Sequence, residues 1–207
     1  MIYLSGKRTP SLPAMLTPRM GQRPLPGQTW AADNGRFSAP QDYSDASYLE
    51  WLASMPVESC LFATAPDVVA DALATYALSL PMFPKIRALG YRVALVAQDG
   101  LEDLTIPWDA FDALFIGGST EWKLGPEAAA IAAEAKAHGK WVHMGRVNSR
   151  RRMVYAESIG CDSADGTYLK FNPSGRPDLW ADHVRGNPSL WRPLDTEGLL
   201  TGKDGAA

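Results

Sequence analysis

The stretch Arg92–Gly100 reads RVALVAQDG, an apolar run followed at once by polar and turn-forming residues. An apolar run of this kind is typical of a parallel strand that is covered on both faces. Two later stretches repeat the arrangement: Ala113–Glu121 reads ALFIGGSTE, and Trp141–Asn148 reads WVHMGRVN. The repetition predicts a mainly parallel sheet whose strands each end in polar or glycine-rich residues.

Strands and helices alternate along most of the chain. Strand candidates lie near residues 3, 31, 62, 95, 115, 142 and 162, and seven or eight such units favour an α/β fold of the compact (β/α)8 TIM-like barrel type. An open doubly wound sheet is the alternative, although no GxGxxG or P-loop sequence supports its nucleotide-binding form. The helical segments expected between strands are Asp45–Met55, Val68–Leu89 with breaks near Pro81 and Pro84, Pro107–Phe111, Pro126–His138 and Ser149–Ile159.

Length and composition favour one domain. With 207 residues, 46% of them hydrophobic, the chain is long enough for one well-packed domain and short for two. We expect residues 1–185 to form a single catalytic barrel domain and residues 186–207 a C-terminal tail. Residues 7–29 are rich in proline and carry basic residues, which predicts a loop or tail without long helices. A last helical candidate is Pro177–Val184.

Charge and cysteine usage limit the class of protein. A net charge of −3 argues against a globally basic nucleic-acid binder but leaves room for a local basic patch. The two cysteines, Cys60 and Cys161, match no zinc spacing, so we expect no structural zinc, no cofactor and a reducing cytoplasm. The N-terminus lacks an apolar signal region and no stretch approaches about 18 consecutive apolar residues, so we expect no membrane span.

Aspartates at two strand ends are the candidate catalytic groups. Asp162 and Asp165 are three residues apart, so on an extended strand they point to opposite faces, and one can face a pocket while the other braces a turn. Asp33 stands in an Asp-Asn-Gly sequence after another strand candidate. In both places a purely turn-stabilising role is the alternative. The polar residues that follow the strands predict an active site at one barrel end: Asp33, Asp67, Gln98, Gly118, Glu121, Gly145, Arg146 and Asp165.

Five motifs, in chain order, resemble those of the tRNA-guanine transglycosylase family. Asp33–Phe37 (DNGRF) resembles the family's Asp-Ser-Gly-Gly-Phe, and Val96–Gly100 (VAQDG) its Ile-Val-Gln-Gly-Gly. Ile116–Glu121 (IGGSTE) is similar to Gly-Gly-Leu-Ala-Val-Gly-Glu, and His143–Gly145 (HMG) to Leu-Met-Gly. Gly160–Asp165 (GCDSAD) matches Gly-Val-Asp-Met-Phe-Asp.

The resemblance implies a role for each matched residue. Asp165 corresponds to the family's nucleophile and Asp33 to its acid/base. Glu121 lies where it would read a substituent at position 7 of the base. The residues implied to bind the base are Asp67, Gln98, Gly117, Gly118, Glu121, Met144 and Gly145.

The chain departs from the tRNA-modifying members in lacking their Cys/His zinc subdomain. In this it looks most like the short bacteriophage branch, which inserts 7-deazaguanine bases into DNA. The resemblance therefore implies a pentosyltransferase that replaces guanine in DNA with a 7-deazaguanine derivative of the preQ0 or preQ1 type, through a covalent Asp–deoxyribose intermediate. For a phage-encoded protein the compartment would be the host cytoplasm, and the modification would serve restriction evasion.

Arginines are the candidate DNA contacts. Those beside the nucleophile strand and those in the Pro-rich segment could grip phosphates, with a solvated helix face as the alternative. They are Arg146, Arg150, Arg151, Arg152, Arg19 and Arg23. We expect His143 to be a packed, structural side chain and Trp122 to be a candidate for stacking on a base.

Three other functions stay open from the sequence. The chain could be a tRNA-guanine transglycosylase, or it could apply the same carboxylate chemistry to free nucleosides as a hydrolase or deoxyribosyltransferase. It could also be a non-catalytic barrel that binds a purine. Incorporation of labelled base into polymer separates these alternatives, and the sequence does not indicate the oligomeric state.

Overall fold

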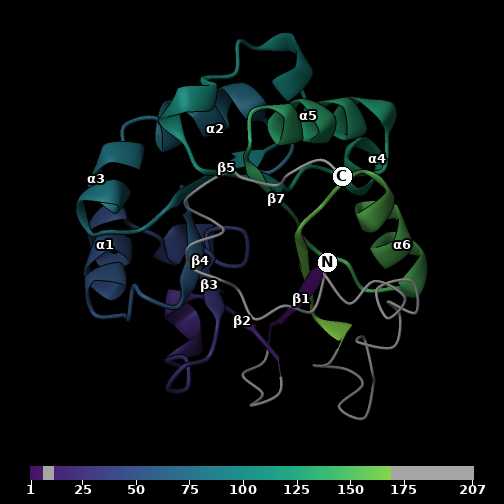
Figure 1. Cartoon of the computed structure of the whole chain (residues 1–207). Coiled ribbons are helices and arrows are strands. Elements are labelled where there is room, and N and C mark those ends of the chain that lie inside the picture. Colours follow the sequence, from purple (N-terminus) through teal and green to yellow (C-terminus); the bar gives the residue numbers. More distant parts are fainter. Residues whose placement is uncertain (7–11, 169–207) are drawn as a thin grey trace.

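Eight parallel strands close into a barrel in chain order, β1 to β8, in a computed structural model that describes residues 1–6 and 12–168 (Figure 1). Closure is made by β8 pairing with β1, where Tyr3 lies opposite Ala164. The α/β TIM-like barrel is therefore confirmed and the open doubly wound sheet is excluded. The strands are β1 (Ile2–Ser5), β2 (Ala14–Leu16), β3 (Trp30–Ala32), β4 (Cys60–Thr64), β5 (Val93–Ala97), β6 (Ala113–Ile116), β7 (Trp141–Met144) and β8 (Ser163–Gly166).

The helices lie outside the barrel as an arc from α1 and α3 through α2 and α5 to α4 and α6 (Figure 1). The predicted run Val68–Leu89 is two helices, because Pro84 lies in the first turn of α3, where a missing N–H costs nothing. None of the described helices is long and apolar enough to cross a membrane. The elements are α1 (Asp45–Ala53), α2 (Ala72–Ser79), α3 (Phe83–Ala88), α4 (Thr120–Lys123), α5 (Pro126–Ala137) and α6 (Arg150–Ser158), with 3-10 turns η1 (Pro18–Met20), η2 (Pro40–Asp42), η3 (Leu101–Asp103) and η4 (Trp108–Ala110).

Within the segment predicted as a Pro-rich loop, residues 7–29, the structure describes residues 12–29 and shows a strand there that was not expected. The segment contains strand β2, whose three residues pair with β3 from Ala14–Trp30 to Leu16–Ala32, and the turn η1. Proline is tolerated here because Pro13 and Pro18 flank the strand, and the Pro13 carbonyl still accepts a hydrogen bond from Ser5 N. The predicted tail 186–207 and the helical candidate Pro177–Val184 lie outside the described residues.

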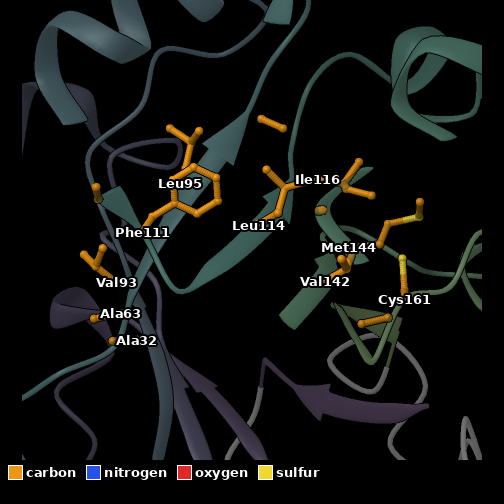
Figure 2. Packing of buried hydrophobic residues seen from close by; sticks show 14 of the residues in the cluster. Ala32, Ala63, Val93, Leu95, Phe111, Leu114, Ile116, Val142, Met144 and Cys161 are labelled. Atoms are coloured by element: carbon orange, nitrogen blue, oxygen red, sulfur yellow. The ribbon is translucent and has the colours of Figure 1, made fainter. Parts of the chain in front are cut away.

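Side chains alternate between two apolar layers because successive residues of a strand point to opposite faces. One cluster, which includes inward-pointing side chains such as Phe62, comprises Leu4, Met15, Ala31, Leu61, Phe62, Ala94 and Ala113. The outer layer packs the strands against the helices. Figure 2 shows its members Val93, Leu95, Leu114, Ile116, Val142 and Met144, two from each of β5, β6 and β7.

Candidate active site

A pocket lies at the carboxyl ends of the strands and holds about 500 Å³ of space, its open mouth included. This is the end at which TIM barrels place their active sites. Eight residues singled out from the sequence line it: Asp33, Asp67, Gln98, Gly117, Gly118, Gly145, Arg146 and Asp165. Six further residues complete the lining: Asn34, Phe37, Thr64, Val69, Val96 and Phe115.

A chain of hydrogen bonds links the loops that follow β3, β4, β5 and β6. Asn34 Nδ2 donates to Asp67 Oδ1 at 3.0 Å, and Gln98 Nε2 donates to Asp67 Oδ2 at 2.7 Å. Gln98 Oε1 in turn accepts the backbone N–H of Gly118 at 2.9 Å. The Asp67 side chain is 9% exposed, and burial raises its pKa although these neutral donors oppose the shift. The chain fixes the wall of the pocket before any ligand enters.

This chain corrects one expectation about base recognition. The Gly118 N–H, expected to face the base, already donates to Gln98 within the protein. Gly118 itself is required, because its φ is +58° and a Cβ there would lie 2.4 Å from the Trp122 ring. Trp122, the candidate stacking residue, is 8% exposed and packs against this glycine, not across the pocket.

Asp33 is the carboxyl group whose chemistry the site changes most. It follows β3, lines the pocket and accepts the Gly35 N–H at 2.8 Å. Burial, with the nearby charges of Asp165 and Asp67, raises its pKa to about 7 in spite of that hydrogen bond. An acid with this pKa can both donate and accept a proton near neutral pH.

Asp165 lies in β8 and faces the pocket, whereas Asp162 precedes the strand and lies at the opposite barrel end. Asp162 accepts both the Lys136 ammonium, at 2.8 Å, and the Val142 N–H, at 2.7 Å. Asp165 Oδ1 lies 3.0 Å from His143 Nε2. The two aspartates are thus separated by barrel end and not, as predicted, by the two faces of one strand: Asp165 lines the pocket and Asp162 braces the start of β7.

Arg146 spans the pocket rim. Its guanidinium donates to the Gly118 carbonyl and lies over the Phe37 ring, 5.2 Å from the centroid. Phe37 is 57% exposed, so the pair presents a flat, partly apolar surface at the mouth. Gly145, the neighbour of Arg146, leaves room for the Phe115 ring in the pocket wall, because a Cβ at this position would lie 2.6 Å from that ring.

Lys123 lies behind this wall and was not expected from the sequence. Its side chain is buried, and its ammonium donates to the Gly145 carbonyl at 2.8 Å. Burial, and then the charge of Arg146, lower its pKa to about 7, while Asp165 opposes the shift. Lys123 thus supports the loop after β7 from outside the pocket.

Other predicted site residues do not line the pocket. Met144 is fully buried in the outer layer between strands and helices. Glu121 is exposed on α4. Arg23 is not among the residues that line the pocket.

The remaining arginines lie around the rim. Arg150 and Arg151 are exposed in the first turn of α6, whereas Arg152 donates to the Arg146 carbonyl at 3.1 Å and so braces the rim. Arg19 lines a neighbouring hollow, beside Asp42 at 3.5 Å.

Comparison of the sequence with protein-family models finds no match, and comparison with curated proteins finds none either. Among residues 1–6 and 12–168, no three His, Cys, Asp or Glu side chains are grouped so as to hold a metal ion.

Proposed function

We propose that the protein is a guanine transglycosylase that exchanges a base in DNA for a 7-deazaguanine derivative. The observation that carries this proposal is the meeting of Asp33, Asp67 and Asp165 in one pocket, each from a different strand end. Asp33 and Asp67 accept hydrogen bonds from neutral amide groups, and Asp33 has a pKa of about 7. Paired carboxyl groups, one a nucleophile and one an acid/base, are the general solution for retaining displacement at a sugar C1′.

In the first half of the reaction, Asp165 attacks C1′ of the deoxyribose. The C1′–N9 bond breaks, a C1′–O ester forms on Asp165, and the protonated Asp33 gives its proton to the departing guanine. In the second half, the entering base loses its N9 proton to the Asp33 carboxylate. N9 then attacks C1′ and releases Asp165, which returns both aspartates to their starting states.

Asp67 and Gln98 are the proposed base-reading pair. Their mutual hydrogen bond orients the Asp67 carboxylate as an acceptor for the donors at N1 and N2 of guanine. A base without those donors would cover the Asp67 carboxylate without filling its remaining acceptor positions, at a cost of about 1–3 kcal/mol. Phe37, with Arg146 over it, offers a stacking face at the mouth.

The arginines of α6 support a nucleic-acid substrate. Arg150 and Arg151 occupy the first turn of α6, at the positive end of the helix dipole, where basic residues cost stability. A phosphate at this place would be attracted by the charges of both arginines and by the helix dipole. The target base must leave the base stack of the DNA duplex to reach the pocket. DNA is the polymer we propose.

The test is side-by-side labelling of duplex DNA, single-stranded DNA and bulk tRNA with radiolabelled guanine at one salt concentration, followed by counting of acid-insoluble label. We expect label in DNA, and its displacement by an unlabelled 7-deazaguanine base. Label confined to tRNA would refute the DNA assignment and leave the exchange chemistry standing. Release of free base from nucleosides would indicate a hydrolase, and binding of guanine with no label in any polymer would indicate a non-catalytic barrel.

A further inference from the structure

A buried chain of polar side chains runs through the barrel interior and ends at Asp165. The Trp141 indole Nε1–H donates to Ser163 Oγ at 2.8 Å, and Ser163 Oγ lies 2.8 Å from His143 Nδ1. His143 Nε2 lies 3.0 Å from Asp165 Oδ1. All four residues belong to β7 and β8, whose alternation places them on the inner face.

The chemistry of the four groups gives the chain a direction. The indole N–H of Trp141 is a donor only, so Ser163 Oγ accepts from it. The Asp165 carboxylate can only accept, so His143 Nε2 carries the proton and donates it to Oδ1. The Ser163 hydroxyl, which already accepts from Trp141, donates to Nδ1 and keeps that nitrogen unprotonated, so the two neighbours together fix the Nε2–H tautomer.

Two aromatic rings pack against the imidazole, in addition to the hydrogen bonds at both of its nitrogens. His143 is fully buried, with the ring centroid of Phe115 at 4.6 Å and that of Phe62 at 5.2 Å. A polar ring in this apolar layer costs free energy unless both nitrogens are bonded. An apolar residue would fill the same space without that requirement, so packing alone does not explain a histidine here.

We propose that His143 is a positioning residue for Asp165: it holds Oδ1 so that Oδ2 faces the reacting carbon. As a neutral donor it orients the carboxylate without cancelling its charge, which a Lys or Arg partner would do. The same N–H stays on Oδ1 when that atom becomes the ester carbonyl oxygen and when charge returns to it as the sugar leaves. This role rests on the proposed base exchange, but the tautomer does not.

The tautomer can be tested by nitrogen NMR of the full chain labelled with ¹⁵N-histidine. The chain has three histidines, so the His143 signals are assigned by their loss in His143→Gln. We expect the Nε2–H form in the wild type, and loss of this single form in Ser163→Ala. An Nδ1–H tautomer in the wild type would overturn the proposal, whether or not the protein exchanges bases.

The positioning role is tested by kinetics on two matched variants. His143→Phe keeps a ring between Phe62 and Phe115 but removes the donor, and should lower kcat for exchange by about 10- to 100-fold with the KM for free base unchanged. His143→Gln can place an amide N–H near the Nε2 position and should recover part of that loss. Full kcat in His143→Phe, or equal loss in both variants in step with their Tm, would refute positioning. Failure of the wild type to exchange any base would instead refute the proposed function.

Discussion

The two ends of the barrel use aspartate in opposite ways. At the amino end, Asp112 and Asp162 each meet a cation and a backbone N–H: Asp112 binds Arg87 at 2.7 Å and Val93 N at 2.8 Å. Asp162 does the same with Lys136 and Val142 N. Each of these aspartates precedes a strand and anchors it to its neighbour.

At the carboxyl end, Asp33, Asp67 and Asp165 lie in one pocket. Repulsion between their carboxylates makes ionisation of each one less favourable. Asp165 and Asp67 both act to raise the pKa of Asp33. Grouping like charges in a partly buried pocket works against folding, and such groups are often found where chemistry needs them. The same residue type thus stabilises one end and, in the function we propose, would supply reactivity at the other, which is the division expected of a TIM barrel.

The largest effect should come from Asp165→Asn. Asparagine keeps an oxygen for the His143 N–H but is no nucleophile, so exchange should fall by at least about three orders of magnitude. Circular dichroism, Tm and guanine binding should stay close to wild type. Gel-resolved trapping of a protein–DNA adduct should succeed with wild type and fail with the variant. Wild-type-like exchange by the variant would contradict the mechanism.

Asp33→Asn should lower exchange and raise stability together. General acid/base groups contribute about 10²- to 10⁴-fold to rates, so the loss should fall in that range. The folded pKa of about 7 lies above the ordinary value of 3.8, so the folded state binds the extra proton and stability falls as pH rises between them. Asparagine removes that penalty. Its Tm should exceed that of wild type by a few degrees at pH 8 and match it at pH 4.

The same pKa predicts the pH dependence of the wild type. Only the protonated Asp33 can give a proton to the departing guanine. In a single turnover, release of guanine should therefore slow as pH rises through about 7. A rate that is flat from pH 6 to pH 8 would assign the proton to another group.

Much of the barrel could be predicted from the sequence because its strands are long apolar runs with abrupt polar ends. The strand candidates near residues 95, 115 and 142 fall within β5, β6 and β7. Strand β2 was missed because it has three residues between Pro13 and Pro18, too few for a period of two to be recognised. Its place in the barrel is set by pairing with β3, which is a tertiary contact.

The site was predicted less completely, and the errors have structural causes. Met144 was expected to face the base, yet the strand alternates, and it is His143 that points inward. A motif match gives residue types but does not show which side of the strand each side chain faces. Met144 was therefore assigned to the base, whereas His143 is the side chain that points into the barrel. Asn34, Thr64 and Lys123 act through contacts with distant loops, for which the local sequence holds no signal.

Replacing the arginines of α6 should have a moderate effect, and only on the interaction with DNA. Replacing Arg150 and Arg151 with glutamate should raise the KM for DNA about tenfold and reduce its salt dependence, with free-base affinity unchanged. Arg152 is left intact because it braces the Arg146 carbonyl. The Arg150→Lys/Arg151→Lys variant keeps the charges and serves as the control. An unchanged KM in the glutamate variant would place DNA elsewhere on the barrel.

The smallest effect on catalysis should come from Asp162→Ala at the amino end. The variant removes the acceptor of Lys136 and leaves the Val142 N–H without its side-chain partner. The ion pair is partly exposed, with side-chain exposures of 40% for Lys136 and 26% for Asp162, so losing it accounts for only a fraction of the lost stability. The backbone donor contributes the rest, so the free energy of unfolding should fall by about 1–2 kcal/mol, measured by urea titration. Exchange per folded molecule should not change, because Asp162 and Asp165 lie at opposite ends of β8. A loss of kcat in Asp162→Ala with folding intact would show that the two ends are coupled, and the separation of stability from reactivity would then be wrong.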